Sequence, residues 1–533
     1  MLTVASCARH QVDPAPTPLV EAPETYSVEP PAPEEPLEAW WLAFSDPTLN
    51  DLIDTALAQN VTVAQALERI DRAEALLRQA KAIRKPQVDV TADVERTWER
   101  SRLKDDGIGT AEKVDDAVES FNDFLSSVEA YRDAISSLAG GGGDGEGGGG
   151  RENLPDLRRP ESTGPPKGWV EDYETEFSSG LSLSWEADVW GRLRSAARAQ
   201  AEEYAAAVED YEALRLILTS QVAEAYYLAV EQRLQYELLL EQRESAETLL
   251  ELIELRFLQG SASVVDVLQQ KGQLAEIDAE VPVVHSQLRI FENRLDVLLG
   301  VAPDGADRTP ETEPNLPRET ALPSVGVPVT LLQNRPDLRA LRRRVVAADY
   351  RIASAIAERL PRLTLTGALE YGDTSLASTL TATGAAGLFQ PLLDWGLRKA
   401  AVDEARSDFR EALLEYTYGY LLAIEEVESA LWREARQRDL IEALAAREAI
   451  LQQTLDETRV RYGLGVTDYL PVLTAIQDLQ DVQRELLTER RALVSLRIEI
   501  NRAIGGTVPA EPGAVRTANE RPEAGNPAAG NGV

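Results

Sequence analysis

Apolar residues recur at helical spacing through two long segments, at about 191–258 and 396–462. The first repeats them every three or four positions, at Leu214, Leu218, Val222, Ala225 and Leu228. The second does so at Leu413, Tyr416, Tyr420, Ile424, Val427 and Leu431. This spacing is typical of helices that pack as coiled coils. At a rise of 1.5 Å per residue, each segment predicts a helix roughly 100 Å long.

A glycine-containing break ends each long segment. The two breaks read "RFLQGSASVVDVL" (256–268) and "RYGLGVTDYLPVL" (461–473), and helical patterns resume after them as far as Gly300 and Gly505. Glycine permits the left-handed backbone that a tight reversal requires. Each half of the chain is therefore predicted to contain a long antiparallel helical hairpin with its tip at the break.

Apolar and polar residues alternate in four short segments, which predicts β-strands with one apolar and one polar face. Three are clear: "VDVTADVERT" (88–97), "LSLSWEADV" (181–189) and "LTLTGALEY" (363–371). "LFQPLLDW" (388–395) shows the pattern less cleanly. The fold class is therefore mixed α and β, with two strands before each long helix.

The two halves of the chain are copies of one another. Arg461 follows Arg256 by 205 residues, and Trp395 follows Trp190 at the same spacing. Pro361, ahead of the third predicted strand, follows Pro86 by 275 residues. The 70-residue difference between the two spacings places an insertion in the first half, at roughly 98–180.

The insertion contains "GGGGDGEGGGG" (140–150) and a proline-rich stretch. No Lys-Ser/Thr follows the glycines, so a flexible loop is favoured over a phosphate-binding loop. The matching loop of the second half, around 372–386, is predicted to be short. The predicted organisation is a start and tether, a first repeat, a linker, a second repeat and a disordered tail, at 1–37, 38–300, 301–330, 331–505 and 506–533.

Cys7 is the only cysteine in the chain and follows "VAS". This resembles the end of a bacterial lipoprotein signal, in which the cysteine becomes the lipidated first residue, although the charged and apolar regions of a complete signal do not precede it. Residues 11–36 are rich in proline and acidic residues, which predicts an extended tether. We expect lipid anchoring at Cys7; a cysteine present by chance is the alternative.

Composition excludes several functions. The 54 Lys and Arg residues against 90 Asp and Glu give a net charge of −36, which argues against nucleic-acid binding. One cysteine and two distant histidines argue against a His/Cys metal site. The sequence has no run of 18 apolar residues, so it predicts no transmembrane helix. Since no catalytic or cofactor motif is present either, we expect no metal, no cofactor and no enzymatic activity.

Four short strands are too few to close a membrane barrel, for which eight is the practical minimum. Open edges invite uncontrolled pairing, so a barrel shared by several chains is one solution. Strands of about nine residues suit a tilted membrane strand, with apolar residues toward lipid and polar residues toward water. A small soluble sheet packed on helices would show the same alternation, so the pattern alone leaves both open.

Several motifs resemble one known family. "WWLAFSDPTLNDLIDTALAQN" (40–60) is similar to the N-terminal signature of outer-membrane efflux lipoproteins, the TolC-like channel family and its OprM/NodT branch. "LSWEADVWGRLRSA" (183–196) and "PLLDWGLRKA" (391–400) resemble the strand-to-helix junctions of its two repeats. "NRPDLRA" (334–340) resembles the start of its second half, and "RYGLGVTDYLPVL" its hairpin tip. The resemblance covers about 38–505.

The resemblance implies a homotrimer with a twelve-strand barrel in the outer membrane and a helical tunnel in the periplasm. It also implies passive export of small molecules that an RND-type inner-membrane pump delivers through a periplasmic adaptor, the membrane fusion protein. A conduit for type I protein secretion and a periplasmic coiled-coil scaffold without a pore are the alternatives. The lipoprotein-like start favours small-molecule efflux.

Three groups of candidate site residues follow. The tips, expected to contact the adaptor or hold the closed end, contribute Arg256, Phe257, Gly260, Arg461, Tyr462 and Gly465. Many relatives line a constriction with an Asp nine residues after the glycine that matches Gly465. Here that position is Thr474, so the expected aperture residues are Asp266, Asp468 and Thr474. The polar strand faces, expected to line the lumen and favour cations, carry Asp89, Asp93, Glu95, Glu186, Asp188 and Glu370, with no Lys or Arg at the same parity.

Overall fold

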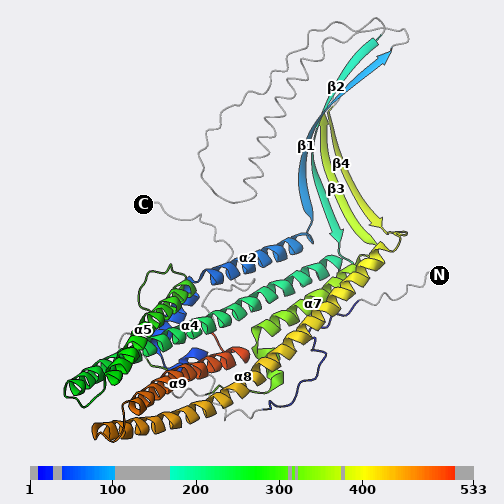
Figure 1. The fold of residues 1–533 in the computed structure, drawn as a ribbon. Coiled ribbons are helices and arrows are strands. Elements are labelled where there is room, and N and C mark those ends of the chain that lie inside the picture. Colours follow the sequence, from blue (N-terminus) through cyan, green and yellow to red (C-terminus); the bar gives the residue numbers. More distant parts are fainter. Residues whose placement is uncertain are drawn as a thin grey trace, which may run out of the picture. The chain divides into compact units, whose positions relative to one another are not determined.

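The computed structural model describes residues 10–27, 39–102, 169–309, 315–317, 322–323, 325–373 and 378–509. The chain divides into two compact units (Figure 1). A helical unit holds Met1–Ala80, Arg194–Ala357 and Gly396–Val533, and a sheet unit holds Lys81–Leu193 and Glu358–Trp395. Within the described residues, no helix combines the length and apolarity needed to cross a bilayer.

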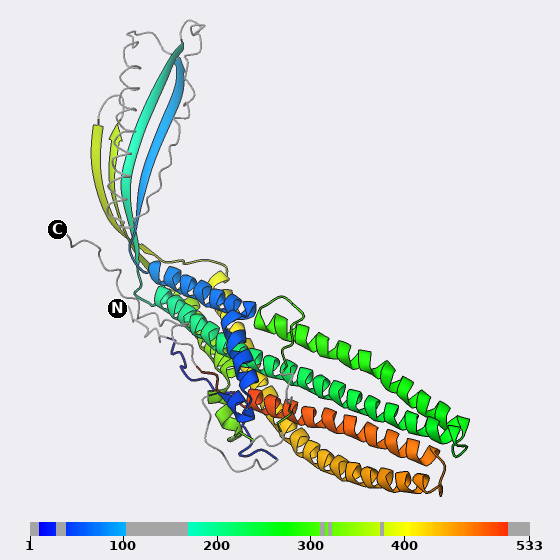
Figure 2. The same cartoon turned by 90° about the vertical axis from the view of Figure 1, so that its left-hand side faces the viewer.

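The helical unit is built from two long hairpins, as the sequence predicts. The first joins α4 (Arg192–Leu258) to α5 (Val264–Leu299), and the second joins α8 (Leu397–Gly463) to α9 (Leu470–Ala503), as Figure 2 shows. The shorter elements are η1 (Trp40–Phe44), α1 (Pro47–Gln59), α2 (Val61–Ala82), η2 (Pro328–Thr330), α6 (Leu331–Asn334) and α7 (Pro336–Ala357).

Both hairpin tips turn in the same way. Gly260 and Gly465 have φ values of 76° and 71°, a region that favours glycine. The backbone N–H of Ser261 donates to the Arg256 carbonyl and that of Val466 to the Arg461 carbonyl, each at 2.9 Å. These bonds satisfy the last carbonyls of α4 and α8. The glycines therefore have the turn-forming role that the sequence predicts.

The duplication is visible in atomic contacts as well as in sequence. The Asn60 side-chain amide donates to the Leu298 carbonyl at 2.7 Å, and the Arg335 guanidinium donates to the Ala503 carbonyl at 3.0 Å. Asn60 and Arg335 are 275 residues apart, and Leu298 and Ala503 are 205 apart. The two halves therefore join the end of a long returning helix to the start of the repeat in the same way.

Each half has its own apolar core where the short helices cover the long hairpin. In the first half, Trp40, Trp41 and Phe44 of η1 are at most 5% exposed and belong to one core with Tyr226 and Tyr227 of α4. In the second half, the core contains Leu331, Leu338, Val345, Tyr416, Tyr420 and Val427. Burying one such side chain contributes about 1.5–3 kcal/mol, so both cores stabilise the helical unit.

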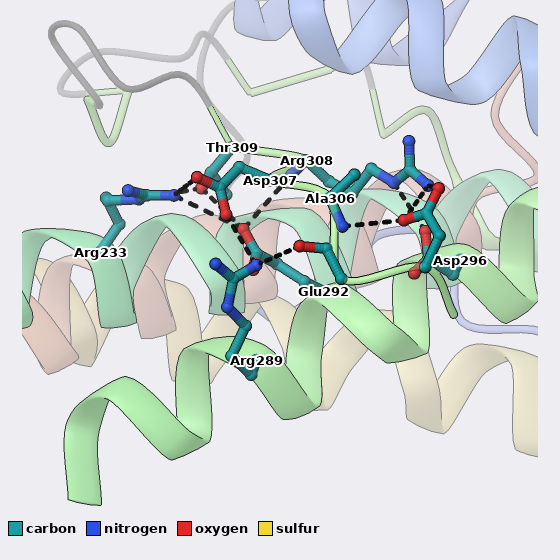
Figure 3. A network of polar contacts seen from close by, with 10 residues as sticks. Arg233, Arg289, Glu292, Asp296, Ala306, Asp307, Arg308 and Thr309 are labelled. Atoms are coloured by element: carbon teal, nitrogen blue, oxygen red, sulfur yellow. Dashed lines mark hydrogen bonds and ion pairs between the residues drawn. The ribbon is translucent and has the colours of Figure 1, made fainter. Parts of the chain in front are cut away.

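Residues 301–309, the start of the predicted linker, are bound to α4 and α5 by a polar network (Figure 3). The buried carboxylate of Glu292 accepts a hydrogen bond from Arg289 at 2.9 Å. Arg308 donates to the buried Asp296 at 2.6 Å, and Arg233 lies between Glu292 and Asp307, 3.6 and 3.5 Å from them. Buried carboxylates are tolerated when guanidinium groups pair with them in this way.

Residues 10–27 pack on the second half and are hereafter called the strap. His10 pairs with Asp349 of α7, and the backbone N–H of Leu19 donates to Thr417 of α8 at 3.1 Å. Tyr26 is 6% exposed within the second core. These residues form no helix or strand, in keeping with an extended segment, but Tyr26 gives them an apolar anchor that the sequence analysis did not predict. Cys7 lies outside the described residues.

The C-terminal tail is also bound where it is described. The backbone N–H of Trp40 donates to the Thr507 carbonyl at 3.1 Å. Residues 506–509 are therefore not part of a disordered tail, and 510–533 lie outside the described residues.

The sheet unit is a four-stranded antiparallel sheet in chain order (Figures 1 and 2). Its strands are β1 (Gln87–Arg102), β2 (Trp169–Ala187), β3 (Arg362–Asp373) and β4 (Ser378–Phe389). The first three predicted strands are confirmed in position. β1 and β2 are longer than predicted and take in 98–102 and 169–180, which were assigned to the insertion loop. Residues 103–168 of that loop lie outside the described residues.

The fourth strand is misplaced in the prediction. β4 ends at Phe389, whereas the predicted segment was 388–395, and much of the predicted short loop 372–386 is strand. The physical reason is composition: β4 contains small residues from Gly384 to Gly387, which weaken the apolar–polar alternation. Pro391, which cannot donate to a ladder, lies within the predicted segment.

The strap should depend on Tyr26. Tyr26→Ala removes a buried aromatic ring, at a cost of about 3 kcal/mol. We expect amide hydrogen exchange across residues 13–27 to accelerate roughly 100-fold, since each 1.4 kcal/mol is tenfold. Leu19→Ala is the matched control, because Leu19 is 63% exposed. Equal exchange in both variants would contradict an anchoring role for Tyr26.

Candidate functional site

The strand register sorts the side chains of the sheet onto two faces. Asp89 lies opposite Ser182, Ser182 opposite Ala368, and Ala368 opposite Thr383. Residues that share this parity form the acidic face: odd-numbered positions from Gln87 to Thr97 in β1, even-numbered positions from Glu174 in β2 and throughout β3, and odd-numbered positions in β4. The remaining positions form the apolar face.

The apolar face is exposed rather than covered. It includes Val88, Val90, Val94, Leu181, Leu183, Leu365, Leu369, Leu380 and Leu388, all between 37% and 72% exposed. From Leu363 to Asp373, which lies opposite Phe177, β3 advances ten steps of one residue and so spans roughly 33 Å along the strand. A strand tilt of about 40° reduces this to about 25 Å, the height of the apolar band on outer-membrane barrels.

Aromatic residues lie near both ends of this apolar band. Trp185 is near one end, and Phe177 and Tyr371 are near the other. Membrane barrels place aromatic girdles at the two interfaces in the same way. The outward chemistry of the sheet therefore suits a bilayer.

The acidic face brings together four of the predicted lumen residues. Asp89, Asp93, Glu95 and Glu370 all lie on it and are exposed. Glu95 lies directly opposite Glu176, and Glu174 follows on the same face. Like charges in opposed positions repel unless water solvates them. This face is therefore chemically fit to border water.

Glu174 and Glu176 are functional candidates that the sequence analysis missed. They fell inside the predicted insertion loop. The signal was present in "YETEF" (173–177), where both glutamates alternate with Tyr173 and Phe177.

Two predicted lumen carboxylates have local partners. Glu186 accepts hydrogen bonds from Arg192 at 3.0 and 2.7 Å, so its charge is compensated. Asp188 lies beyond the end of β2 and accepts a hydrogen bond from the backbone N–H of Leu193 at 3.1 Å. Asp188 therefore helps to begin α4. Because it lies outside the strand, the alternation of β2 does not assign it to either face of the sheet. The predicted absence of basic residues on this face is also wrong, because Arg362 shares its parity and pairs with Glu358.

At the hairpin tips, Arg256 and Tyr462 connect the two halves. The Arg256 guanidinium lies 4.4 Å from the centre of the Tyr462 ring and 3.4 Å from the Tyr462 carbonyl oxygen. Tyr462 is buried, and its ring lies 5.6 Å from that of Tyr469. Burial raises the pKa of both phenols, so both remain neutral at physiological pH. This pair suits holding the tips together better than contacting another protein.

The other predicted tip residues are accessible. Phe257 is 43% exposed, and Arg461 is exposed and pairs with Glu457 on its own helix at 2.8 Å. Gly260 and Gly465 form the turns. Phe257 and Arg461 can therefore be reached by a partner.

The three predicted aperture residues differ in their surroundings. The Asp266 carboxylate accepts a hydrogen bond from the backbone N–H of Ser263 at 3.0 Å and completes the capping box of α5. Asp468 and Thr474 are exposed. Asp266 therefore has a structural role at the helix start, which its spacing from Gly260 did not reveal.

A polar seam between α5 and the second hairpin was not predicted. The Tyr469 hydroxyl pairs with the Gln270 amide oxygen. Gln273 donates to Gln480 at 3.0 Å and accepts from Gln477 at 2.7 Å. The sequence does place these glutamines at the helical spacing of the neighbouring apolar residues, and this pattern could have indicated the seam. Close to the tips, the two hairpins therefore meet through side-chain hydrogen bonds as well as through a buried apolar cluster that contains Val267 and Val472.

Arg256→Gln should loosen the contact between the tips. A cation–π contact is worth ~1 kcal/mol, so we expect about a fivefold rise in the separated population. Pulsed electron paramagnetic resonance between spin labels at Leu258 and Leu464 measures this separation. Arg461→Gln is the matched control, since Arg461 pairs within its own helix. Indistinguishable distance distributions in the two variants would count against the Arg256–Tyr462 contact.

This chain is similar to known proteins in sequence and in architecture. The sequence model described as "Outer membrane efflux protein" matches residues 157–301 and 327–506. The chain is 26% identical over 479 residues to "Nodulation protein T" of Rhizobium leguminosarum bv. trifolii, covering 88% of this chain and 87% of that protein. It is 29% identical over 348 residues to "Toluene efflux pump outer membrane protein TtgF" of Pseudomonas putida, covering 62% and 70%.

Among solved structures, the Campylobacter jejuni CmeC outer membrane channel superposes with a TM-score of 0.72 at 21% identity, covering 95% of this chain and 96% of that one. The TolC-like fold class expected from the sequence is therefore confirmed. With the family match spanning more than half of its residues, the chain belongs to the outer membrane efflux protein family.

Proposed function

We propose that this chain is the outer-membrane channel of a tripartite efflux system. It conducts small molecules passively from an inner-membrane RND-type pump and a periplasmic adaptor to the outside. The observation that carries the proposal is the two-faced sheet, with an exposed apolar face and an acidic face. A soluble coiled-coil scaffold has no use for an exposed apolar band of this height.

The channel in this proposal is a homotrimer. Four strands cannot enclose a water-filled lumen, whereas three chains supply twelve strands, well above the minimum for a barrel. In that ring the apolar faces meet outer-membrane lipid and the acidic faces meet the lumen. The long hairpins of the three chains form the periplasmic tunnel.

The strap supports lipid anchoring at Cys7. His10, three residues after Cys7, pairs with Asp349. Asp349 lies eight residues before the end of α7, and the chain then continues into β3 at Arg362. The strap therefore begins three residues after the proposed anchor site and is itself bound to the helical unit. A lipid at Cys7 would add to the attachment that the proposed barrel provides.

The hairpin tips are the proposed adaptor site. Leu258, Leu464 and Val466 are 81%, 74% and 71% exposed at the two turns. Apolar side chains at this exposure are typical of surfaces that bind another protein. Phe257 and Arg461 extend this surface, while Arg256 and Tyr462 hold the two tips together. Asp468 and Thr474 are the proposed aperture residues.

The acidic face favours cationic and neutral substrates. Fixed carboxylates concentrate cations in a narrow water column with low-dielectric walls. Relatives of this chain include proteins named for toluene, cation and pyoverdine export, so family membership alone permits many substrates. The negative charge of the acidic face is the feature of this chain that narrows the range of proposed substrates.

Planar-bilayer recordings test the proposal. Purified protein should give discrete conductance steps, and under a KCl gradient the reversal potential should show cation preference. That preference should grow as salt falls, because the screening length is about 8 Å at physiological ionic strength and longer below it. A protein that inserts without conducting would contradict the channel.

Removing carboxylates from the acidic face should reduce this preference. Asp93→Asn, Glu95→Gln and Glu176→Gln combined should lower the cation-to-anion permeability ratio at least twofold at low salt. Asp54→Asn, at an exposed position of α1, is the control and should leave the ratio unchanged. Anion preference, or an unchanged ratio in the triple variant, would show that this face does not line the conducting path.

A further inference from the structure

The two β-hairpins of the sheet have the same register. Gln87 of β1 lies opposite Ser184 of β2, and Arg362 of β3 lies opposite Phe389 of β4. Arg362 follows Gln87 by 275 residues, and Phe389 follows Ser184 by 205. Adding 275 to a residue of β1 and 205 to its partner in β2 thus gives a pair of residues that lie opposite each other in β3 and β4.

Side-chain contacts at the base of the hairpins repeat in the same way. The Trp185 indole N–H donates to the Arg84 carbonyl at 3.0 Å. At the equivalent positions, the Gln390 amide donates to the Arg359 carbonyl at 3.2 Å. The residue type differs, but the bond from the end of one strand to the chain ahead of its neighbour is retained. Equivalent positions therefore make equivalent contacts.

A second kind of contact joins the two hairpins and occurs once in the described part of the chain. Leu181 of β2 lies opposite Leu369 of β3, and the Trp190 indole N–H donates to the Pro361 carbonyl at 2.7 Å. The equivalents of these four residues are Ala386, Val94, Trp395 and Pro86, which lie on or beside β4 and β1. β1 and β4 are the opposite edges of the sheet, so these equivalents cannot meet within one open sheet.

The residues at this unused joint are exposed. Trp395 is 91% exposed, compared with 40% for Trp190, and Leu392 is 93% exposed. Trp395 also has a φ of 53°, a left-handed conformation that is strained for a bulky residue. Trp190 is not among the described residues with positive φ. Trp395, at the junction after β4, thus lacks the conformation and the degree of burial that Trp190 has at the junction after β2.

We propose that β4 of one copy pairs with β1 of a second copy in the register that places Ala386 opposite Val94. The Trp395 indole N–H then donates to the Pro86 carbonyl of the second copy. This inference rests on the proposed function, in which several copies share one sheet. It specifies which residues of the two edges meet.

The chemistry of the two edges agrees with this register. It aligns Ser378, where β4 begins, with Arg102, where β1 ends. It keeps the acidic face continuous, since Thr383 lies opposite Thr97 and Ala385 opposite Glu95. The run from Gly384 to Gly387 lies opposite Asp93 to Arg96, so small residues of β4 face bulkier residues of β1. Residues 390–393 come to lie beside 87–90.

Disulfide trapping tests the register. Val94→Cys and Ala386→Cys in one chain should give a covalent oligomer on a non-reducing denaturing gel, which reductant returns to monomer. Val90→Cys with Ala386→Cys is the matched control: Val90 is also an apolar-face valine, but it is about 13 Å away along the strand. That offset exceeds the Cα separation of about 7 Å that a disulfide tolerates. Neither single substitution should give a covalent oligomer.

Three results would overturn the proposal. They are a covalent oligomer in the Val90 pair, a disulfide confined to the monomer in the Val94 pair, and no disulfide in the Val94 pair of a preparation that still conducts ions when reduced. The last result rejects the register while the proposed channel stands. Failure of the unsubstituted protein to conduct is the separate result that rejects the channel itself.

The indole bond has its own test. Trp395→Phe keeps the ring but removes the donor, and should lower the temperature at which the detergent-solubilised oligomer dissociates by several degrees. Trp432→Phe is the control, since Trp432 is an exposed tryptophan of α8 whose indole donates to Ser27 at 3.0 Å. An unchanged dissociation temperature in Trp395→Phe would overturn the contact with Pro86.

Discussion

The backbone groups along the outer edges of β1 and β4 impose the constraint on which this molecule depends. In a bilayer no water is available to these N–H and C=O groups, and each unsatisfied group costs several kcal/mol. Four strands are too few to close on themselves. In the proposed channel, the edges therefore find their partners in other copies. The exposed apolar face, the acidic face and the duplicated registers acquire a common explanation when they do.

Duplication is an economical way to meet this constraint. A chain that contains the same hairpin twice already carries, between β2 and β3, the joint that it needs between β4 and β1. The helical unit follows the same logic, with the Asn60–Leu298 and Arg335–Ala503 contacts at equivalent positions. Near the tips the two hairpins are joined in two ways. Hydrogen bonds link Tyr469 to Gln270 and Gln273 to Gln480. A buried apolar cluster brings Ile253 and Val267 of the first hairpin together with Tyr462, Tyr469 and Val472 of the second.

The sequence predicts the features that depend on strong periodicity. The long helices, their tips at Gly260 and Gly465, and the alternating strands β1 to β3 all follow from repeating patterns. β4 was misplaced because glycine and alanine between 384 and 387 carry little amphipathic signal. Asp188 and Asp266 also hydrogen-bond backbone N–H groups at helix starts, and this local role depends on backbone geometry that the sequence pattern did not reveal. The Glu186–Arg192 pair and the Arg256–Tyr462 contact depend on where the chain turns, and no spacing rule contains that information.

The two-faced sheet is tested most directly by the accessibility of single cysteines along β1 in a lipid bilayer. Each residue from Val88 to Glu95 is replaced in turn, and labelling by a membrane-impermeant thiol reagent is compared with that of the unsubstituted protein. The odd-numbered positions, which include Asp89 and Asp93, should react because they face water. The even-numbered positions, which include Val88 and Val90, should be protected by lipid. Equal labelling at odd and even positions, or the reverse alternation, would contradict an apolar face toward the membrane and an acidic face toward the lumen.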